Sequence, residues 1–159
     1  MFDLKKTKKI CLISSSGGHL SQLKQIIPVV SEDDFFIITE KNESTLDLSG
    51  KYPTYYLKQQ DRRNKFIILI LIYNVVKSLF ILLKSRPKYI ITTGAGVVIP
   101  VCLLGKLMRS KILFIESFAK VNTPTLTGRL IYKFADEFYI QWPNLKKYYP
   151  KAKYRGTIY

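Results

Sequence analysis

A polar loop near the N-terminus carries the first residues whose types and spacing could do chemistry. It lies between an apolar run typical of a buried strand and a helical pattern, and it consists of Ser14, Ser15, Ser16, Gly17, Gly18 and His19. Glycines let the backbone approach an anion, and a helix start offers free amide protons, so the loop fits a pyrophosphate cradle. It matches neither the Walker loop nor the GxGxxG fingerprint. An ordinary tight turn is an equal alternative.

Two residues are candidates for proton transfer or for contacts with a sugar. His19, the only histidine, follows two glycines and could act as a general base or donate to a phosphate. Glu116 ends an expected buried strand, where its carboxylate could bind a sugar hydroxyl or accept a proton. The structural alternatives are a packing histidine and a helix-capping or ion-paired acid.

A second glycine loop, Thr92-Thr93-Gly94-Ala95-Gly96, follows another expected strand. Gly94 and Gly96 favour close approach of a ligand or of a neighbouring loop, although each glycine alone is typical of a strand-to-helix turn. Because ligands of parallel sheets bind at the carboxyl ends of the strands, we expect both glycine loops and the segment 116–123 to converge on one cleft.

The elements that position these loops follow from the hydrophobic periodicity. We expect strands over 9–14, 35–39, 54–57, 88–93, 112–116 and 138–141, with a last strand or a tail over 154–158. We expect helices over 19–30, 42–48, 66–83, 97–108, 125–135 and 145–149. Alternating strands and helices predict an α/β fold, a single Rossmann-like domain over 1–159 with a doubly wound parallel sheet.

The segment 66–83 is apolar over 18 residues with one charge, Lys77, which makes it marginal as a membrane span. Strands on both sides should join one sheet, so its ends must return to the same side of a bilayer. We therefore expect a helix that packs on the sheet and presents Phe66, Ile68, Leu71 and Phe80 to a membrane surface. A fully buried helix is the alternative, but it would not explain the flanking basic residues Arg62, Arg63, Lys65, Lys84, Arg86 and Lys88.

The overall charge indicates an anionic partner. Lys and Arg number 26 against 11 Asp and Glu, a net charge of +15. We expect an anionic membrane surface rather than nucleic acid, because the basic residues flank an apolar stretch instead of forming a stripe with stacking aromatics. A basic nucleic-acid-binding module is the alternative, favoured by the tyrosines and lysines of 146–155. Cys11 and Cys102 lack metal-ligand spacing, and we expect neither a metal nor a cofactor.

The ordered motifs Ser-Ser-Gly-Gly-His-Leu, Thr-Thr-Gly-Ala-Gly and Glu-Ser-Phe resemble one family over nearly the whole chain. It is the membrane-anchor subunit of the two-part N-acetylglucosaminyltransferase of dolichol-linked oligosaccharide synthesis, with bacterial PssD-type relatives in capsule and exopolysaccharide synthesis. The chain is also similar to the N-terminal half of the peptidoglycan lipid II synthase, a GT-B glycosyltransferase. A free-standing nucleotide-binding protein is a weaker alternative, for which Glu40 stands near the expected acidic position.

The resemblance implies a heteromeric glycosyltransferase at the cytoplasmic face of the plasma membrane. This chain would bind a polyprenyl-pyrophosphate-linked sugar acceptor, and a separate GT-B C-terminal-half subunit would supply the nucleotide-sugar site. Ser16, Gly17, Gly18 and His19 match the acceptor-side loop, Gly94 and Gly96 the second glycine loop, and Glu116 the acidic position. The eukaryotic subunit has an N-terminal membrane span, whereas only Met1 to Thr7 precede the first expected strand here, so the resemblance assigns anchoring to 66–83.

The segment 154–159 ends in Ile158 and Tyr159 after Gly156. We expect it to dock the partner subunit, because aromatic residues contribute disproportionately at interfaces. An edge strand that completes the domain's own sheet is nearly as strong an alternative.

Overall fold

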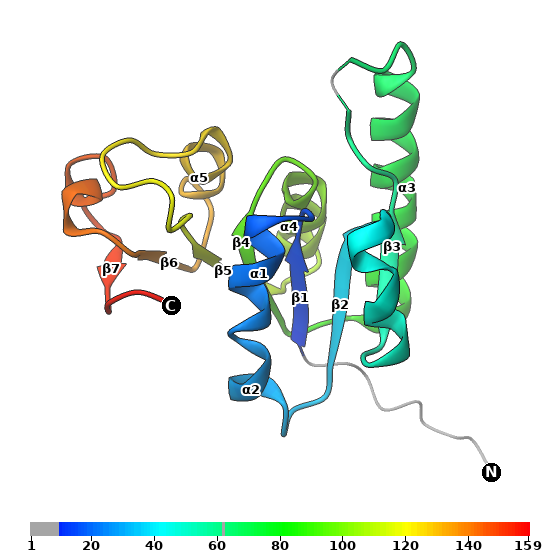
Figure 1. The fold of residues 1–159 in the computed structure, drawn as a ribbon, viewed down its shortest axis with the longest axis horizontal. Helices are drawn as coiled ribbons and strands as arrows, with labels where there is room; N and C mark the ends of the chain where they lie inside the picture. Colours follow the sequence, from blue (N-terminus) through cyan, green and yellow to red (C-terminus); the bar gives the residue numbers. More distant parts are fainter. Residues whose placement is uncertain (1–9, 62) are drawn as a thin grey trace.

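The computed structural model describes residues 10–61 and 63–159, which form a three-layer α/β/α domain around one parallel sheet (Figure 1). The sheet has the strand order β3-β2-β1-β4-β5-β6-β7. The strands are β1 (Ile10–Ser14), β2 (Phe35–Glu40), β3 (Thr54–Leu57), β4 (Tyr89–Gly94), β5 (Lys111–Ile115), β6 (Glu137–Ile140) and β7 (Lys153–Tyr154). The predicted Rossmann-like, doubly wound parallel sheet is confirmed.

The helices cover the sheet on both faces. They are α1 (Gly18–Lys24), α2 (Ile27–Val30), α3 (Ile67–Ser85), α4 (Val98–Leu107) and α5 (Leu126–Ile131), with the 3₁₀ segments η1 (Glu43–Gly50) and η2 (Pro143–Lys147). Alternate residues of each strand point to opposite faces. Leu12 therefore packs with α1, α2 and η1, whereas Cys11 and Ile13 pack with α3, α4 and α5. Cys11 and Cys102 are buried thiols whose pKa is raised by burial, as expected of core residues.

The strand order places a topological switch point between β1 and β4. From β1 the chain winds outward through β2 to β3, and α3 then carries it back across the sheet to β4, from which it winds the other way. The loops after the two central strands therefore leave the same edge of the sheet in opposite directions. A crevice opens between such loops, and this is where open α/β sheets bind ligands.

Several predicted element bounds differ from the structure. The helix expected over 19–30 is broken into α1 and α2, because Pro28 has no amide proton and its ring would clash with the carbonyl of Lys24 in a continuous helix. The segment expected over 42–48 is the 3₁₀ segment η1, and the helix expected over 125–135 ends at Ile131. The last strand is only Lys153–Tyr154. Predictions for Met1 to Thr7, Lys9 and Arg62 lie outside the described residues.

The helix α3 differs from an ordinary core helix in which face it buries. Asn74, Ser78 and Ser85 are buried against the domain together with Ile81 and Leu82, whereas most of its large apolar side chains are exposed. Asn74 holds the backbone of Lys58 in both directions: its Nδ2 donates to the Lys58 carbonyl at 2.8 Å, and the Lys58 amide donates to its Oδ1 at 2.9 Å. Asn74, a polar residue that interrupts the apolar segment, therefore attaches the helix to the domain together with the apolar contacts of Ile81 and Leu82.

Candidate functional site

The two glycine loops meet at the switch point. The amide of Ser15 donates to the carbonyl of Gly94 at 3.1 Å, and Ser14 pairs with Gly94 in the register of β1 and β4. The hydroxyl of Thr93 donates to the carbonyl of His19 at 2.7 Å. The prediction that these loops lie together is confirmed, and hydrogen bonds from Ser15 to Gly94 and from Thr93 to His19 fix their relative position.

The ring of His19 is held by the second loop. Its Nδ1 lies 2.7 Å from the carbonyl oxygen of Thr93, which can only accept a hydrogen bond, so Nδ1 carries a proton. In the neutral ring Nε2 is then the unprotonated nitrogen, which can accept a proton or, when charged, donate to an anion. Gly94 makes this placement possible, because a Cβ at that position would lie 3.2 Å from Cε1 of His19.

The glycines of the first loop have different roles. Gly17 has a φ of +78°, a conformation that other residues adopt with strain, and Gly94 has a φ of +97°. Gly18 begins α1 with an ordinary φ, and nothing lies within 4 Å of the position that its Cβ would occupy. The backbone thus requires Gly17 and Gly94, whereas Gly18 leaves open space beside the exposed loop.

A cleft of about 370 Å³ opens beside the two loops. Its lining combines residues from the ends of β1, β2 and β4 with residues from the loop before α3 and from the first turns of α3, namely Ser15, Glu40, Gln60, Ile67, Leu71, Ala95, Gly96 and Val97. One wall is polar and the other is the apolar start of α3. Two residues predicted to bind the acceptor, Ser15 and Gly96, therefore share a cleft with Leu71, which is predicted to contact the membrane.

Glu40 is the acidic residue of this cleft, and the sequence pattern indicated it only as the acidic position of the alternative nucleotide-binding protein. Its carboxylate accepts from the amide of Ser16 at 3.3 Å and from the amide of Gln60 at 3.0 Å. It thus ties the first glycine loop to the segment that leads into α3. Among the described residues, Nε2 of Gln60 is buried without a hydrogen-bond partner, which leaves one donor at the cleft. The signal in the sequence was an acid at the carboxyl end of the second strand.

Glu116 does not line this cleft. It is fully buried, and its carboxylate accepts from the amides of Ser117 and Thr125 at 2.8 and 3.1 Å and from the hydroxyls of Thr125 and Tyr149, both at 2.8 Å. Burial and the neighbouring carboxylate raise the pKa of Tyr149, which stays a donor. Gly128 packs so closely that a Cβ would lie 2.3 Å from Glu116 Oε2. This geometry fits a carboxylate that holds the 116–125 loop in place and does not contact a substrate.

The third predicted loop, 116–123, contacts α1 and not the cleft. The amide of Phe118 donates to Oε1 of Gln22, and Nε2 of Gln141 donates to the same oxygen and to the carbonyl of Glu116. The expectation that three loops converge on one cleft is therefore correct for two of them. The third packs beside α1, and a buried amide network holds it there.

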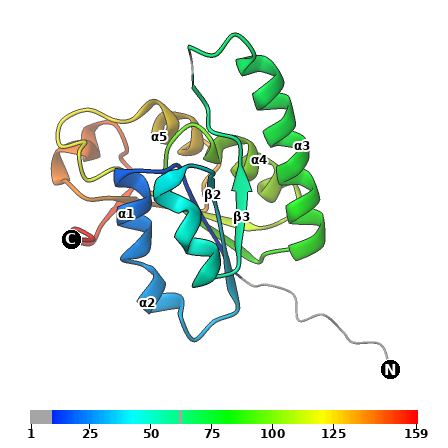
Figure 2. The same cartoon turned by 45° about the vertical axis from the view of Figure 1, so that its right-hand side comes forward.

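The four residues predicted to face a membrane all lie at the surface. Phe66, Ile68, Leu71 and Phe80 are 65%, 69%, 39% and 68% exposed. The fully buried alternative for this helix is therefore wrong. The residues Ile67–Ser85 are long and apolar enough to cross a membrane by length and composition, with a mean hydropathy of 2.2, and they are the one such helix among the described residues. The first turns of α3 rise beyond the carboxyl ends of the strands, on the side of the cleft (Figures 1 and 2).

The tail after β7 lies against its own domain. The amide of Ile158 donates to Oε1 of Gln141 at 2.9 Å, and the ring of Tyr159 contacts that of Phe118 with centroids 5.2 Å apart. Tyr159 is nevertheless mostly exposed. In the part of the chain that the structure describes, no group of three His, Cys, Asp or Glu side chains could hold a metal ion.

Solved structures share this fold. The chain superposes on MurG from Acinetobacter baumannii with a TM-score of 0.73 and 15% identity, over 94% of this chain and 45% of that one. It superposes on UDP-N-acetylglucosamine 2-epimerase from Rickettsia bellii with a TM-score of 0.71 and 12% identity, over 96% of this chain and 45% of that one. The domain thus has the N-terminal-type Rossmann architecture of GT-B enzymes, and it spans less than half of each of these chains.

Sequence relatives are more specific. The chain is 25% identical over 183 residues to the UDP-N-acetylglucosamine transferase subunit ALG14 of Mus musculus, which covers 97% of this chain and 84% of the relative. It is 30% identical over 182 residues to the subunit of the same name from Candida albicans, which covers 98% and 83%. A family model described as "Oligosaccharide biosynthesis protein Alg14 like" matches residues 10–158. The chain therefore belongs to the Alg14-like family of oligosaccharide biosynthesis proteins.

Proposed function

We propose that this chain is the membrane-associated, acceptor-binding subunit of a heteromeric glycosyltransferase. The acceptor is a sugar on a polyprenyl pyrophosphate, and the donor is a nucleotide-sugar held by a partner subunit. The observation that carries the proposal is the composite cleft, in which the glycine loops at the switch point adjoin the exposed apolar start of α3. A lipid-linked pyrophosphate needs both surfaces side by side.

Different parts of the cleft fit different parts of such an acceptor. The polyprenyl chain follows Ile67 and Leu71, and the pyrophosphate lies at the two glycine loops, where Ser15 and Gly96 line the cleft. The other predicted residues, Ser16, Gly17, Gly18 and Gly94, belong to the same loops outside the cleft lining. Gly17, Gly18 and Gly96 are exposed and leave room for phosphate oxygens next to backbone amides, whereas Gly94 is buried against His19. The free Nε2 donor of Gln60 is available to the same group.

The proposed chemistry is transfer of a glycosyl group to an acceptor hydroxyl. The hydroxyl oxygen forms a bond to the anomeric carbon, the bond from that carbon to the nucleotide phosphate breaks, and the nucleoside diphosphate leaves with the electron pair. The hydroxyl proton passes to Nε2 of His19, whose other nitrogen is fixed on Thr93. Glu116 contributes to activity by ordering its own loop, which replaces the catalytic contact expected from the sequence.

The names of the relatives support the donor and the partner. Those relatives are subunits of a UDP-N-acetylglucosamine transferase, which favours this nucleotide-sugar as donor and a second, donor-binding chain. The chain superposes on 45% of the MurG chain, and we assign the donor site to another polypeptide. Capsule or exopolysaccharide synthesis is one setting for the acceptor, and its support is the motif resemblance alone.

The location that we infer is the cytoplasmic face of the plasma membrane, where the protein is peripheral or monotopic. Its support is the exposed apolar face of α3 with Lys84, Arg86 and Lys88 after it, a pattern that binds anionic leaflets. Because β3 and β4 belong to one sheet, both ends of α3 return to the same domain. Nucleic-acid binding is the second candidate, supported by the net charge and by Lys147 and Arg129 over Tyr148.

Reconstitution tests the proposal. The purified chain alone should not transfer sugar from UDP-N-acetylglucosamine to a polyprenyl-pyrophosphate-linked sugar in vesicles, whereas the chain coexpressed with its donor-binding partner should. Robust transfer by the isolated chain would refute the dependence on a partner. Filter binding at two salt concentrations tests the second candidate, because tight and steeply salt-dependent binding to RNA or DNA would favour it.

A further inference from the structure

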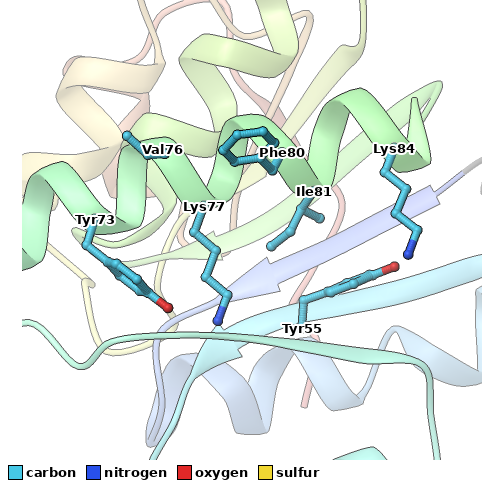
Figure 3. A pocket seen from close by; sticks show the side chains of 7 residues that line it. All are labelled: Tyr55, Tyr73, Val76, Lys77, Phe80, Ile81 and Lys84. Atoms are coloured by element: carbon cyan, nitrogen blue, oxygen red, sulfur yellow. The ribbon is translucent and has the colours of Figure 1, made fainter.

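An apolar groove of about 420 Å³ runs between α3 and the edge strand β3 (Figure 3). Its floor and walls come from Ile81, Phe80 and Val76 of the helix and from the rings of Tyr73 and Tyr55. The volume is in the range of about 300–1,000 Å³ that small-molecule sites occupy. No residue of this groove lines the cleft at the glycine loops, so the two are separate features of the same helix.

Lysines stand at the rim of this apolar groove. Lys77 and Lys84 belong to its lining, and Figure 3 shows both side chains extending from α3 toward β3, with Lys84 directed at the hydroxyl end of Tyr55. The Nζ of Lys58 lies 4.6 Å from the centroid of the Tyr73 ring, and that of Lys77 lies 5.6 Å from it. Within residues 10–61 and 63–159, none of these three lysines forms an ion pair with a carboxylate. The groove thus combines apolar walls with a positive rim that has no carboxylate partner among the described residues.

The chemistry that matches this pattern is an anionic amphiphile. We propose that the groove binds one anionic phospholipid, with an acyl chain against Tyr73, Phe80 and Ile81 and the phosphate between Lys77 and Lys84. The phosphate supplies the missing negative charge, and the groove continues into the exposed apolar face of α3, which would lie among other acyl chains. This is a saturable site with a stoichiometry of one, in contrast to the diffuse attraction of a basic protein to a charged surface.

The test is native mass spectrometry of the full chain released from a nonionic detergent. Dioleoyl phosphatidylglycerol, added at increasing concentration, should give a single dominant lipid adduct, and dioleoyl phosphatidylcholine at the same concentrations should give far less. In Lys77→Gln/Lys84→Gln the affinity for phosphatidylglycerol should fall about 30-fold, because each lysine near an anionic headgroup contributes roughly one kcal/mol. The measurement needs neither partner nor sugar donor, so its outcome is independent of the proposed transferase activity.

Two matched controls separate the site from general effects. Lys133→Gln/Lys151→Gln removes the same charge from exposed positions near β6, toward the opposite edge of the sheet from β3 and the groove, and should leave the adduct unchanged. Val76→Trp should fill the groove and abolish the adduct, whereas Val75→Trp, at an exposed neighbouring position outside the lining, should not.

Three outcomes would overturn the proposal. Equal adducts with both lipids would remove the role of the lysines in headgroup recognition. Equal losses in the two double lysine variants would reduce the effect to net charge. Lipid binding that is insensitive to Val76→Trp, combined with loss of a copurifying protein in that variant, would assign the groove to a protein partner instead.

Discussion

The burial of Asn74 in α3, whose large apolar side chains are mostly exposed, leads to a prediction about the stability of the domain. Asn74→Ala removes both hydrogen bonds to the backbone of Lys58, at 2.8 and 2.9 Å, from a side chain that is only 1% exposed. At about 1 kcal/mol for each lost bond, the cost is about 2 kcal/mol. Alanine returns about 0.5 kcal/mol as the better helix former, so the free energy of unfolding should fall by about 1.5 kcal/mol.

Thermal unfolding in a nonionic detergent measures this change. For a chain of this size we expect Tm to fall by about 3–6 °C. The control is Val75→Ala at the next position, where the side chain is 39% exposed and the expected change is within about 0.5 kcal/mol. A larger loss of stability in Val75→Ala than in Asn74→Ala would refute the reasoning, because it would mean that the apolar face of the helix is packed and the polar face is not.

Three further predictions concern function. Replacing Ile68, Leu71 and Phe80 with Gln should release the protein from vesicles in a flotation assay with its circular dichroism unchanged, because these side chains are exposed; unfolding of the triple variant would show that they belong to the core. Gly18→Val should abolish transfer by the assembled complex without lowering Tm, since its Cβ meets no protein atom; normal turnover would place the loop outside the site. Deletion of 156–159 should lower the free energy of unfolding of the isolated chain by only about 1–2 kcal/mol, because it removes one hydrogen bond and one ring contact. The same deletion should prevent copurification of the donor-binding partner. A sharply lowered Tm with the partner still bound would assign the tail to the domain core.

Much of the fold was accessible from local patterns. Short apolar runs followed by glycine or polar residues marked the strands, and the alternation with helical periodicity gave the doubly wound sheet that the structure contains. The error over 19–30 arose from the same method, because the apolar spacing continued through Pro28 and outweighed the missing amide. Periodicity reports which face is apolar, and it does not report where the backbone hydrogen bonds stop.

The roles of the acidic residues were less accessible. Glu40 and Glu116 both end strands, and their local sequences contain no sign of which one meets the cleft. The partners that decide the matter are distant: Gln60 lies 20 residues from Glu40, and Tyr149 lies 33 residues from Glu116. The carboxylate of Glu116 is held by donors within its own buried surroundings. The carboxylate of Glu40 lines the cleft and joins the first glycine loop to the segment before α3.

Residue types and their spacing are enough to predict the alternation of strands and helices, the glycine loops, the apolar segment with its basic neighbours and the positive net charge. Only contacts in the folded domain show that the loops after β1 and β4 adjoin, that Thr93 fixes the ring of His19, and that buried Asn74 attaches α3 to the domain together with Ile81 and Leu82. These facts depend on contacts between residues far apart in the chain. Whether a side chain faces solvent, a cleft or the core is set by what the rest of the fold brings against it.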